Sequence, residues 1–160
     1  MSGAGVVWRM RVALEGDALL PPRWPEGVSV RTFRADDAAA VHALLEHGYR
    51  QGGGSVAELD TWLPAMIGDS EYDAGLWFLA EAGATLAGVA LCWTSAFVKD
   101  LVVHESWRRR GLGEALLRHV FTTFARRGAT AVELKVDATN AGAIRLYERA
   151  GMRAVERART

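Results

Sequence analysis

Alternation of apolar and polar residues predicts a series of β-strands along this chain. Residues 28–33 alternate cleanly, and in residues 130–136 the apolar Val132, Leu134 and Val136 stand opposite the polar Glu133 and Lys135. Successive side chains of a strand point to opposite faces, so this pattern is typical of a sheet that buries one face. Similar apolar runs predict strands at residues 6–14, 76–81, 86–93, 97–103 and 152–157.

Helical spacing of apolar residues predicts helices between these strands. The clearest helix follows the strand at 97–103, where Leu112, Leu116, Val120 and Phe124 recur every four residues and Gly128 comes after them as a stop signal. A shorter helix is predicted over residues 140–150. The chain is therefore predicted to be an α/β protein.

Two more helices are predicted in the first half of the chain. One covers residues 36–47, and Gly48 is expected to end it. After a glycine-rich loop at 49–54, residues 55–58 match a capping box that opens the second helix. Pro64 is expected to kink or end this helix, because proline lacks the backbone N–H that a helix interior uses.

Composition limits the classes to which this chain can belong. It has 160 residues, 50% of them hydrophobic, and a formal net charge of zero. We therefore expect a single globular domain and no general nucleic-acid binding. No apolar run approaches the ~20 residues that span a bilayer. Residues 1–27 show no secretory signal but a strand and a proline-rich connector, so we expect a cytoplasmic protein whose main domain covers residues 28–160.

Cysteine and histidine give no sign of a metal site. Cys92 is the only cysteine, which excludes an internal disulfide and a CxxC metal cluster. The four histidines show no metal-ligand spacing. No metal cofactor is therefore expected.

The turn after the strand at 97–103 is the clearest candidate for a binding site. Arg108, Arg109 and Arg110 precede Gly111 and Gly113, where the long helix begins. The unpaired N–H groups of a helix start carry partial positive charge, and glycine lets a backbone approach a ligand closely. These properties predict binding of a phosphate or pyrophosphate. The simpler alternative is an ordinary turn whose arginines lie in solvent.

Two common phosphate motifs do not fit this turn. A P-loop requires Gly-Lys-Ser/Thr, whereas Gly113 is followed by Glu114 and Ala115. The dinucleotide fingerprint requires a small residue where this chain has Leu116. The turn is therefore neither of these motifs.

A second candidate motif lies in the helix predicted over residues 140–150. Asn140 and Tyr147 are seven positions apart, which places them on one helix face about 10 Å from each other. In a purely structural interpretation Asn140 caps the helix, Tyr147 packs in the core and Gly151 ends the helix. Both interpretations stay open at this point.

Together the two motifs resemble those of one family. The pattern Arg108-x-x-Gly111-x-Gly113 after an apolar strand is similar to the pyrophosphate loop of GNAT-superfamily N-acetyltransferases, which bind acetyl-coenzyme A. The string Asn140…Ala-Ile-x-Leu-Tyr147-Glu-x-x-Gly-Met resembles their second coenzyme A segment. The resemblance covers roughly residues 28–152. It implies a mixed, mostly antiparallel sheet flanked by helices, and transfer of acetyl to a primary amine by direct attack.

The resemblance also implies roles for individual residues. Tyr147 would protonate the departing thiolate, and Asn140 would contact the pantetheine arm. The remaining implied contacts are made by the backbone: the acetyl and pantetheine groups by Leu101, Val102 and Val103, and the pyrophosphate by Arg108, Arg109, Arg110, Gly111, Leu112, Gly113 and Glu114.

The general base stays open in this comparison. Ribosomal-protein N-terminal alanine acetyltransferases resemble the chain around both motifs, but they have a glutamate five residues before the asparagine, where this chain has Lys135. Glu133 and Asp137 share a face with Lys135, and either is a candidate substitute. Cys92 is not expected to form an acyl-enzyme.

The acceptor pocket is expected near residues 49–55, the second helix and the end of the strand at 86–93. Trp62 and Trp93 are candidates to line it, although burial in the core is the commoner outcome for tryptophan. The acceptor amine itself cannot be read from these residues.

Two other functions compete with acetyl transfer. One is an acyl-coenzyme A binding or sensor domain without turnover, which the missing glutamate favours and Tyr147 disfavours. The other is a generic nucleotide-binding module, which explains the arginine turn but not the pairing of Asn140 with Tyr147.

The N-terminal strand suggests a rearranged sheet. In the family, a hairpin after the Gly-Met segment leads to a final strand that lies between the two preceding strands. Too few residues follow Met152 for both, whereas residues 6–14 form a strand that the family pattern does not use. We therefore expect residues 6–14 to lie antiparallel between 130–136 and 152–157. A monomer and a strand-swapped homodimer would satisfy the same hydrogen bonds.

Overall fold

A mixed β-sheet forms the centre of the computed structural model, which describes residues 5–52 and 55–159 and all of their side chains except those at 51 and 52. Its strands are β1 (Val6–Ala13), β2 (Val28–Thr32), β3 (Trp77–Ala82), β4 (Thr85–Trp93), β5 (Phe97–Val103), β6 (Ala131–Asp137) and β7 (Arg153–Arg159). They lie in the order β2-β3-β4-β5-β6-β1-β7, and only β5 and β6 are parallel. The predicted mixed, mostly antiparallel sheet is confirmed.

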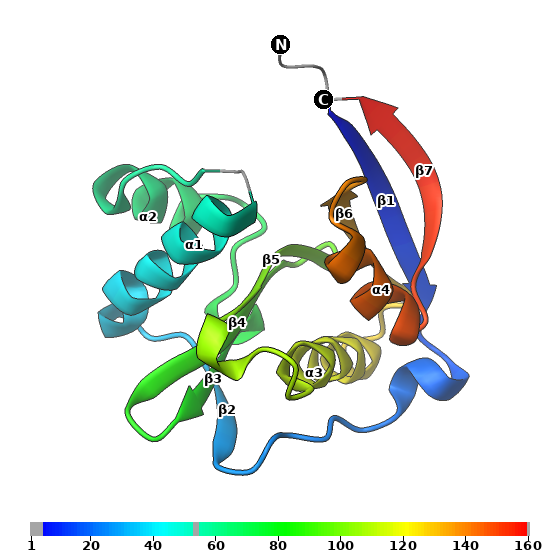
Figure 1. The fold of residues 1–160 in the computed structure, drawn as a ribbon, viewed down its shortest axis with the longest axis horizontal. Helices are drawn as coiled ribbons and strands as arrows, with labels where there is room; N and C mark the ends of the chain where they lie inside the picture. Colours follow the sequence, from blue (N-terminus) through cyan, green and yellow to red (C-terminus); the bar gives the residue numbers. More distant parts are fainter. Residues whose placement is uncertain (1–4, 53–54, 160) are drawn as a thin grey trace.

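Helices cover both faces of this sheet (Figure 1). The helices α1 (Ala38–Gly52) and α2 (Leu59–Ile67) lie on one face, and α3 (Leu112–Arg126) and α4 (Ala141–Arg149) on the other. Apolar side chains under each pair of helices form a separate buried cluster. The residues predicted to form the inner face of α3 are among those buried: Leu112, Leu116, Val120 and Phe124.

The N-terminal strand occupies the predicted position in the sheet. Trp8 pairs with Val136 of β6 on one side of β1 and with Arg157 of β7 on the other, and both pairings are antiparallel. Figure 1 shows β1 beside β7, although the two strands stand at opposite ends of the sequence. Met10 of β1 is only 1% exposed. The strand that the family pattern leaves over is therefore a structural part of the sheet.

The connector after β1 is held against α3. It contains a 3₁₀ turn (η1, Gly16–Leu19) in which Ala18 is buried. Arg118 of α3 donates a hydrogen bond to the carbonyl oxygen of Asp17 at 2.8 Å. The connector therefore runs along the molecule and leads the chain from β1, near one edge of the sheet, to β2 at the other edge.

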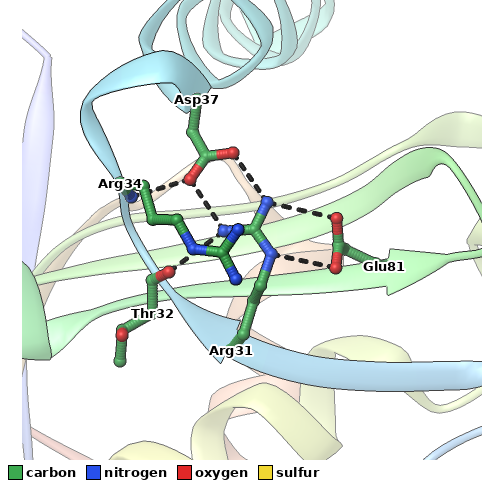
Figure 2. Close-up of polar contacts among 5 residues, drawn as sticks. All are labelled: Arg31, Thr32, Arg34, Asp37 and Glu81. Atoms are coloured by element: carbon green, nitrogen blue, oxygen red, sulfur yellow. Dashed lines mark hydrogen bonds and ion pairs between the residues drawn. The ribbon is translucent and has the colours of Figure 1, made fainter.

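A charged cluster ties β2, β3 and the start of α1 together (Figure 2). The guanidinium of Arg31 donates to both carboxylate oxygens of Asp37, at 2.6 and 2.7 Å, and to Glu81 at 2.9 Å. The backbone N–H of Arg34 donates to Asp37 as well. The Arg31 hydrogen bonds lower the pKa of Asp37, so this carboxylate stays ionised.

The helix α1 is longer than predicted. Gly48 does not end it, and α1 continues to Gly52 through Tyr49, which was expected in a loop. A β-carbon at Gly48 would lie 2.7 Å from a methyl carbon of Val102, so glycine is needed there for close packing on β5. Gly53 and Gly54, the end of the predicted loop, lie outside the described residues.

The second helix starts later than predicted. Residues 55–58 do not form a capping box; α2 begins at Leu59, and Glu58 makes no capping hydrogen bond through its side chain. His42 of α1 donates to the carbonyl oxygen of Ala57 at 2.7 Å, which holds this segment against α1 in a non-helical conformation. Pro64 lies inside α2 and does not end it.

Within the described ranges, no helix is both long and apolar enough to cross a membrane. The same ranges contain no group of three or more His, Cys, Asp or Glu side chains placed to hold a metal ion.

Candidate active site

The sheet opens between its two parallel strands. β5 and β6 pair only at Phe97 with Glu133 and Val98 with Leu134, and they diverge beyond these positions. We call the opening between residues 99–103 of β5 and 135–137 of β6 the wedge. Since β4 pairs with the other side of β5, the β5 edge that faces the wedge presents unpaired backbone groups to a ligand. The backbone of Leu101, Val102 and Val103 is therefore placed to bind an extended chain.

The arginine turn lies at the end of β5, beside the wedge. Arg109 and Gly111 both have positive φ, 61° and 83°. Alternation of left-handed and right-handed residues turns successive N–H groups toward one side, a geometry that binds anions. Arg108, Arg109 and Arg110 are exposed, and the guanidinium of Arg110 lies 4.6 Å from the centre of the Trp107 ring. The turn therefore combines exposed charge with the N–H groups of the α3 start, Leu112, Gly113 and Glu114.

Glycine is needed at the two positions of the turn for different structural reasons. Gly111 adopts a positive φ, and a β-carbon there would meet no atom within 4 Å. Gly113 has no such conformation, but a β-carbon there would lie 2.9 Å from a methyl carbon of Leu146 on α4. Gly113 therefore lets α3 and α4 approach each other, a role that the sequence did not indicate.

Asn140, Tyr147 and Gly151 take the positions in and beside α4 that the structural interpretation expected. Asn140 is the N-cap, and its side-chain oxygen accepts from the backbone N–H of Ala143 at 3.1 Å. Tyr147 is 8% exposed and belongs to the cluster under α3. Gly151, with φ 102°, ends the helix, and the N–H of Met152 donates to the Tyr147 carbonyl oxygen.

Burial changes the acidity of Tyr147. Its removal from water and, to a smaller extent, the nearby charge of Asp100 raise the pKa of the phenol to about 12. Tyr147 therefore keeps its proton throughout the neutral pH range.

Asp100 is a buried carboxylate on β5 at the wedge. Its side chain is 4% exposed, and the hydroxyl of Tyr49 donates a short hydrogen bond to its Oδ1 atom. The ammonium of Lys99, whose side chain is 41% exposed, lies 3.7 Å from Oδ2. Burial and the charge of Asp100 both raise the pKa of Tyr49, which therefore remains a neutral donor.

Asp100 and Tyr147 approach the wedge from opposite faces of the sheet. Asp100 pairs in register with Leu91, which lies in the cluster under α1 and α2. Tyr147 lies in the cluster under α3. Since the charge of Asp100 raises the pKa of Tyr147, the two groups interact electrostatically across the sheet. A ligand in the wedge would have a carboxylate on one side and a phenol on the other.

The candidate bases named from the sequence are engaged in other contacts. Glu133 accepts hydrogen bonds from Arg9 at 2.8 Å and Arg11 at 3.2 Å, and these bonds lower its pKa. Asp137 accepts from the hydroxyl and the backbone N–H of Thr139, and its pKa is lowered too. A lowered pKa makes a carboxylate a weaker base. Neither residue is well prepared to take a proton from an amine.

Two aromatic residues and the single cysteine complete the surroundings. Trp62 is 6% exposed and lies 5.8 Å from Trp77 between ring centres, so it is part of the core. Trp93 is half-buried at the end of β4. Cys92 is fully buried, and burial raises the pKa of its thiol, which suppresses the nucleophilic thiolate.

Sequence reasoning found one wall of this site and missed the other. The arginine turn and Tyr147 come from motifs, and the fold brings them beside the wedge; Asn140, from the same motif as Tyr147, stands at the start of α4. Asp100 was not singled out, and Tyr49 was named only as the first residue of a loop expected at the acceptor pocket. The signal for Asp100 was a charged pair, Lys99 and Asp100, inside an otherwise apolar strand.

Comparisons with known proteins agree with this geometry. The profile of the family described as Acetyltransferase (GNAT) family matches residues 38–152. A mycothiol acetyltransferase from Streptomyces coelicolor is 34% identical over an alignment 155 positions long, which covers 89% of this chain and 48% of that protein. The chain thus spans about half the length of the curated relatives it matches.

Solved structures show the same likeness. A GCN5-related N-acetyltransferase from Sphaerobacter thermophilus superposes with a TM-score of 0.84 at 32% identity, covering 99% of this chain and 51% of that one. The ribosomal-protein-S18-alanine N-acetyltransferase from Escherichia coli gives 0.64 at 25% identity, covering 78% and 76%. With the family profile, these matches confirm the resemblance that the two motifs indicated. The chain belongs to the GNAT family of acetyltransferases.

Proposed function

We propose that this chain transfers the acetyl group of acetyl-coenzyme A to a primary amine. The observation that carries the proposal is the wedge, which has unpaired β5 backbone along one side, an anion-binding turn at its end and the buried phenol of Tyr147 beside it. In this proposal the pantetheine arm lies along Leu101, Val102 and Val103 and beside Asn140. The pyrophosphate lies on the backbone of residues 108–114.

The chemistry is direct attack by a neutral amine. The nitrogen lone pair adds to the thioester carbonyl, a C–N bond forms, and the C–S bond then breaks. The thiolate that leaves takes the proton of Tyr147, and the phenolate regains a proton from the new amide nitrogen or from solvent. A free thiol ionises near ~8.5, but a thiolate formed in a dry cleft is destabilised by the same burial that raises the pKa of Tyr147. The pKa values of the leaving thiol and of the Tyr147 phenol are therefore closer in the cleft than the pKa values of the two free groups suggest.

Two observations support catalysis over simple binding of an acyl-coenzyme A: Tyr147 is buried beside the wedge and protonated, and Asp100 lies on the other face. Cys92 is too deeply buried for a covalent route, which leaves direct attack. The relatives named above are described as acetyltransferases. Their names also suggest acceptors: the unacetylated form of mycothiol and peptides with N-terminal alanine.

The proposal is tested by two measurements on the full chain. Calorimetry should show binding of acetyl-coenzyme A that free nucleotide competes with only weakly. Thiol release should then rise when an amine is added from a panel of amino sugars, aminoglycosides, amino acids, peptides with N-terminal alanine and unacetylated mycothiol. Tight binding without thiol release for any amine would favour the sensor alternative. Equal competition by free nucleotide would favour a nucleotide-binding module.

A further inference from the structure

We propose that Asp100, held by Tyr49, binds the ammonium form of the acceptor amine and takes its proton before attack. This inference rests on the proposed function and adds to it the base that the motifs left open. An ammonium has no lone pair, so an amine that arrives charged must lose a proton before it can attack the thioester.

The contacts of Asp100 suit this role. The carboxylate is almost fully buried, yet its two oxygens differ: Oδ1 accepts from the Tyr49 hydroxyl, and Oδ2 lies 3.7 Å from the ammonium of Lys99. Lys99 is partly exposed, and its ammonium shows that a cation fits beside Oδ2. A substrate ammonium is the same chemical group, so it can take this place while Tyr49 keeps the carboxylate in position.

The position of Asp100 also fits the direction of attack. It directly precedes the β5 residues that line the wedge, and it faces the side covered by α1 and α2, whereas Tyr147 comes from the opposite side. An amine on Asp100 would therefore meet the thioester on one face of the sheet, with the proton donor for the leaving group on the other. The attacking amine and the proton donor for the leaving thiolate thus lie on opposite faces of the sheet.

The proton balance is complete with these groups. The carboxylate of Asp100 takes one proton from R-NH₃⁺ and becomes a carboxylic acid, which leaves R-NH₂ with its lone pair; the acid returns this proton to solvent after the product leaves. Tyr147 later gives one proton to the thiolate. The groups that surround Asp100 are Tyr49 from α1, Tyr147 from α4, Cys92 from β4 and Lys99 beside it on β5. Both phenols and the thiol have raised pKa values and stay neutral.

Gly48 makes this arrangement possible. It packs directly on Val102, with no room for a side chain, and so brings the next residue of α1, Tyr49, to Asp100. Tyr49 is accordingly a positioning residue, whereas Asp100 touches the substrate.

The test compares Asp100→Asn with wild type on an amine that the wild type acetylates. General base catalysis contributes about 10²–10⁴, so kcat/KM for the amine should fall by about that factor while the affinity for acetyl-coenzyme A stays unchanged. The remaining rate should follow the fraction of free amine as the pH rises. An analogue with a less basic amine, made by placing fluorine on the carbon β to the nitrogen, should suffer a smaller loss. Asp36→Asn, an exposed carboxylate in the turn before α1, is the matched control and should behave like wild type.

Tyr49→Phe keeps the aromatic ring and gives an independent readout. Without the hydroxyl, Oδ1 of Asp100 loses the donor that holds it in place, so kcat for the amine should fall while its KM and the affinity for acetyl-coenzyme A stay near the wild-type values. If Asp100→Asn keeps the wild-type kcat/KM and pH profile, or if Tyr49→Phe leaves kcat unchanged, Asp100 is not the base. If the wild type acetylates no amine at all, the proposed function itself fails, and the role of Asp100 fails with it.

Discussion

At the scale of single residues, burial rather than residue type decides which groups around the wedge can react. A cysteine is a common nucleophile and a tyrosine a common acid, but burial raises the pKa of the Cys92 thiol and of the Tyr49 phenol and holds both groups neutral. Tyr147 is buried too, and its phenol stays protonated to about pH 12. A group that must deliver a proton, and not lose it to solvent, benefits from this environment.

The first prediction concerns Tyr147. Tyr147→Phe removes the hydroxyl and keeps the ring in the cluster under α3, so the fold and the affinity for acetyl-coenzyme A should hold while turnover falls by about 10²–10⁴. Steady-state rates and calorimetry measure the two effects separately. Because its pKa is raised, wild-type activity should show no loss from ionisation of Tyr147 in the neutral and mildly alkaline pH range. An unchanged rate in the variant would mean that solvent protonates the thiolate and that Tyr147 only packs.

Individual residues differ in how far the sequence could predict them. Tyr147 and Gly111 stand in local motifs whose spacing carries the information. Asp100 and Tyr49 are 51 positions apart and meet only because α1 packs closely on β5. Such a contact depends on tertiary packing, and no local pattern encodes it. A charged residue inside an apolar strand was the one available hint.

At the scale of elements, the turn between β5 and α3 joins a strand edge to a helix start. Gly111 supplies its left-handed conformation without touching other atoms, whereas Gly113 is also needed for packing against Leu146. A bulky residue at Gly113 would therefore disturb both binding and the α3–α4 contact. Gly111 is the cleaner position for a test of the turn.

The second prediction uses Gly111→Ala. A β-carbon disfavours the positive φ at this residue, so the N–H groups should lose their common direction and the affinity for acetyl-coenzyme A should fall by about 1–3 kcal/mol, roughly tenfold to hundredfold in Kd. Gly83→Ala is the matched control, because Gly83 also has positive φ and free space but lies in the β3–β4 hairpin. Calorimetry that finds the same loss in both variants, or in neither, would speak against the turn as the pyrophosphate site.

The third prediction concerns the cluster of Arg31, Asp37 and Glu81 that ties β2 and β3 to the start of α1 (Figure 2). Asp37→Asn should lower the free energy of unfolding at neutral pH by about 1–2 kcal/mol. The folded-state pKa of Asp37 is lowered, so its contribution is fully present above the unfolded value of about 3.9 and is lost as the pH falls through the folded value. Denaturant titrations should therefore show the difference at pH 7 and its disappearance in strong acid. Asp36→Asn, an exposed neighbour, should change little at either pH.

Periodicity predicted elements better than it predicted their ends. Alternation predicted the strands and the four-residue spacing predicted α3, because an element that buries one face has apolar residues at regular positions. The end of α1 was placed too early because Gly48 looks like a stop signal but serves close packing. The capping box at residues 55–58 failed because His42 holds Ala57 in a tertiary contact. In both places a tertiary contact overrode a local signal.

At the scale of the whole molecule, the sheet is complete only with its N-terminal strand. β1 fills the place between β6 and β7 and removes two unpaired strand edges, which natural proteins avoid exposing. This position was predictable because the family pattern lacked one strand between residues 130–136 and 152–157, and residues 6–14 were the one predicted strand that the pattern did not use. The acceptor was not predictable, because no local pattern specifies it. Whether β1 is exchanged between two copies stays a prediction.

The fourth prediction follows from that position. Deletion of residues 1–14 should unfold the protein, because loss of the buried Met10 side chain alone is expected to cost about 2–5 kcal/mol and the whole strand much more. Met10→Ala should lower the melting temperature to an intermediate value. Thermal unfolding of the wild type, Met10→Ala and the deletion variant measures the three melting temperatures. A deletion variant that melts at the wild-type temperature would show that β1 is dispensable.

The central claim is that acetyl moves directly from coenzyme A to an amine within the wedge. The most direct measurement follows an isotopically labelled acetyl group by mass spectrometry during turnover with an amine that stimulates thiol release. The account predicts that label appears on the amine in step with the free thiol, and that the protein, Cys92 included, carries none. Label that accumulates on the protein, or that leaves only as acetate while the amine stays unmodified, would contradict it.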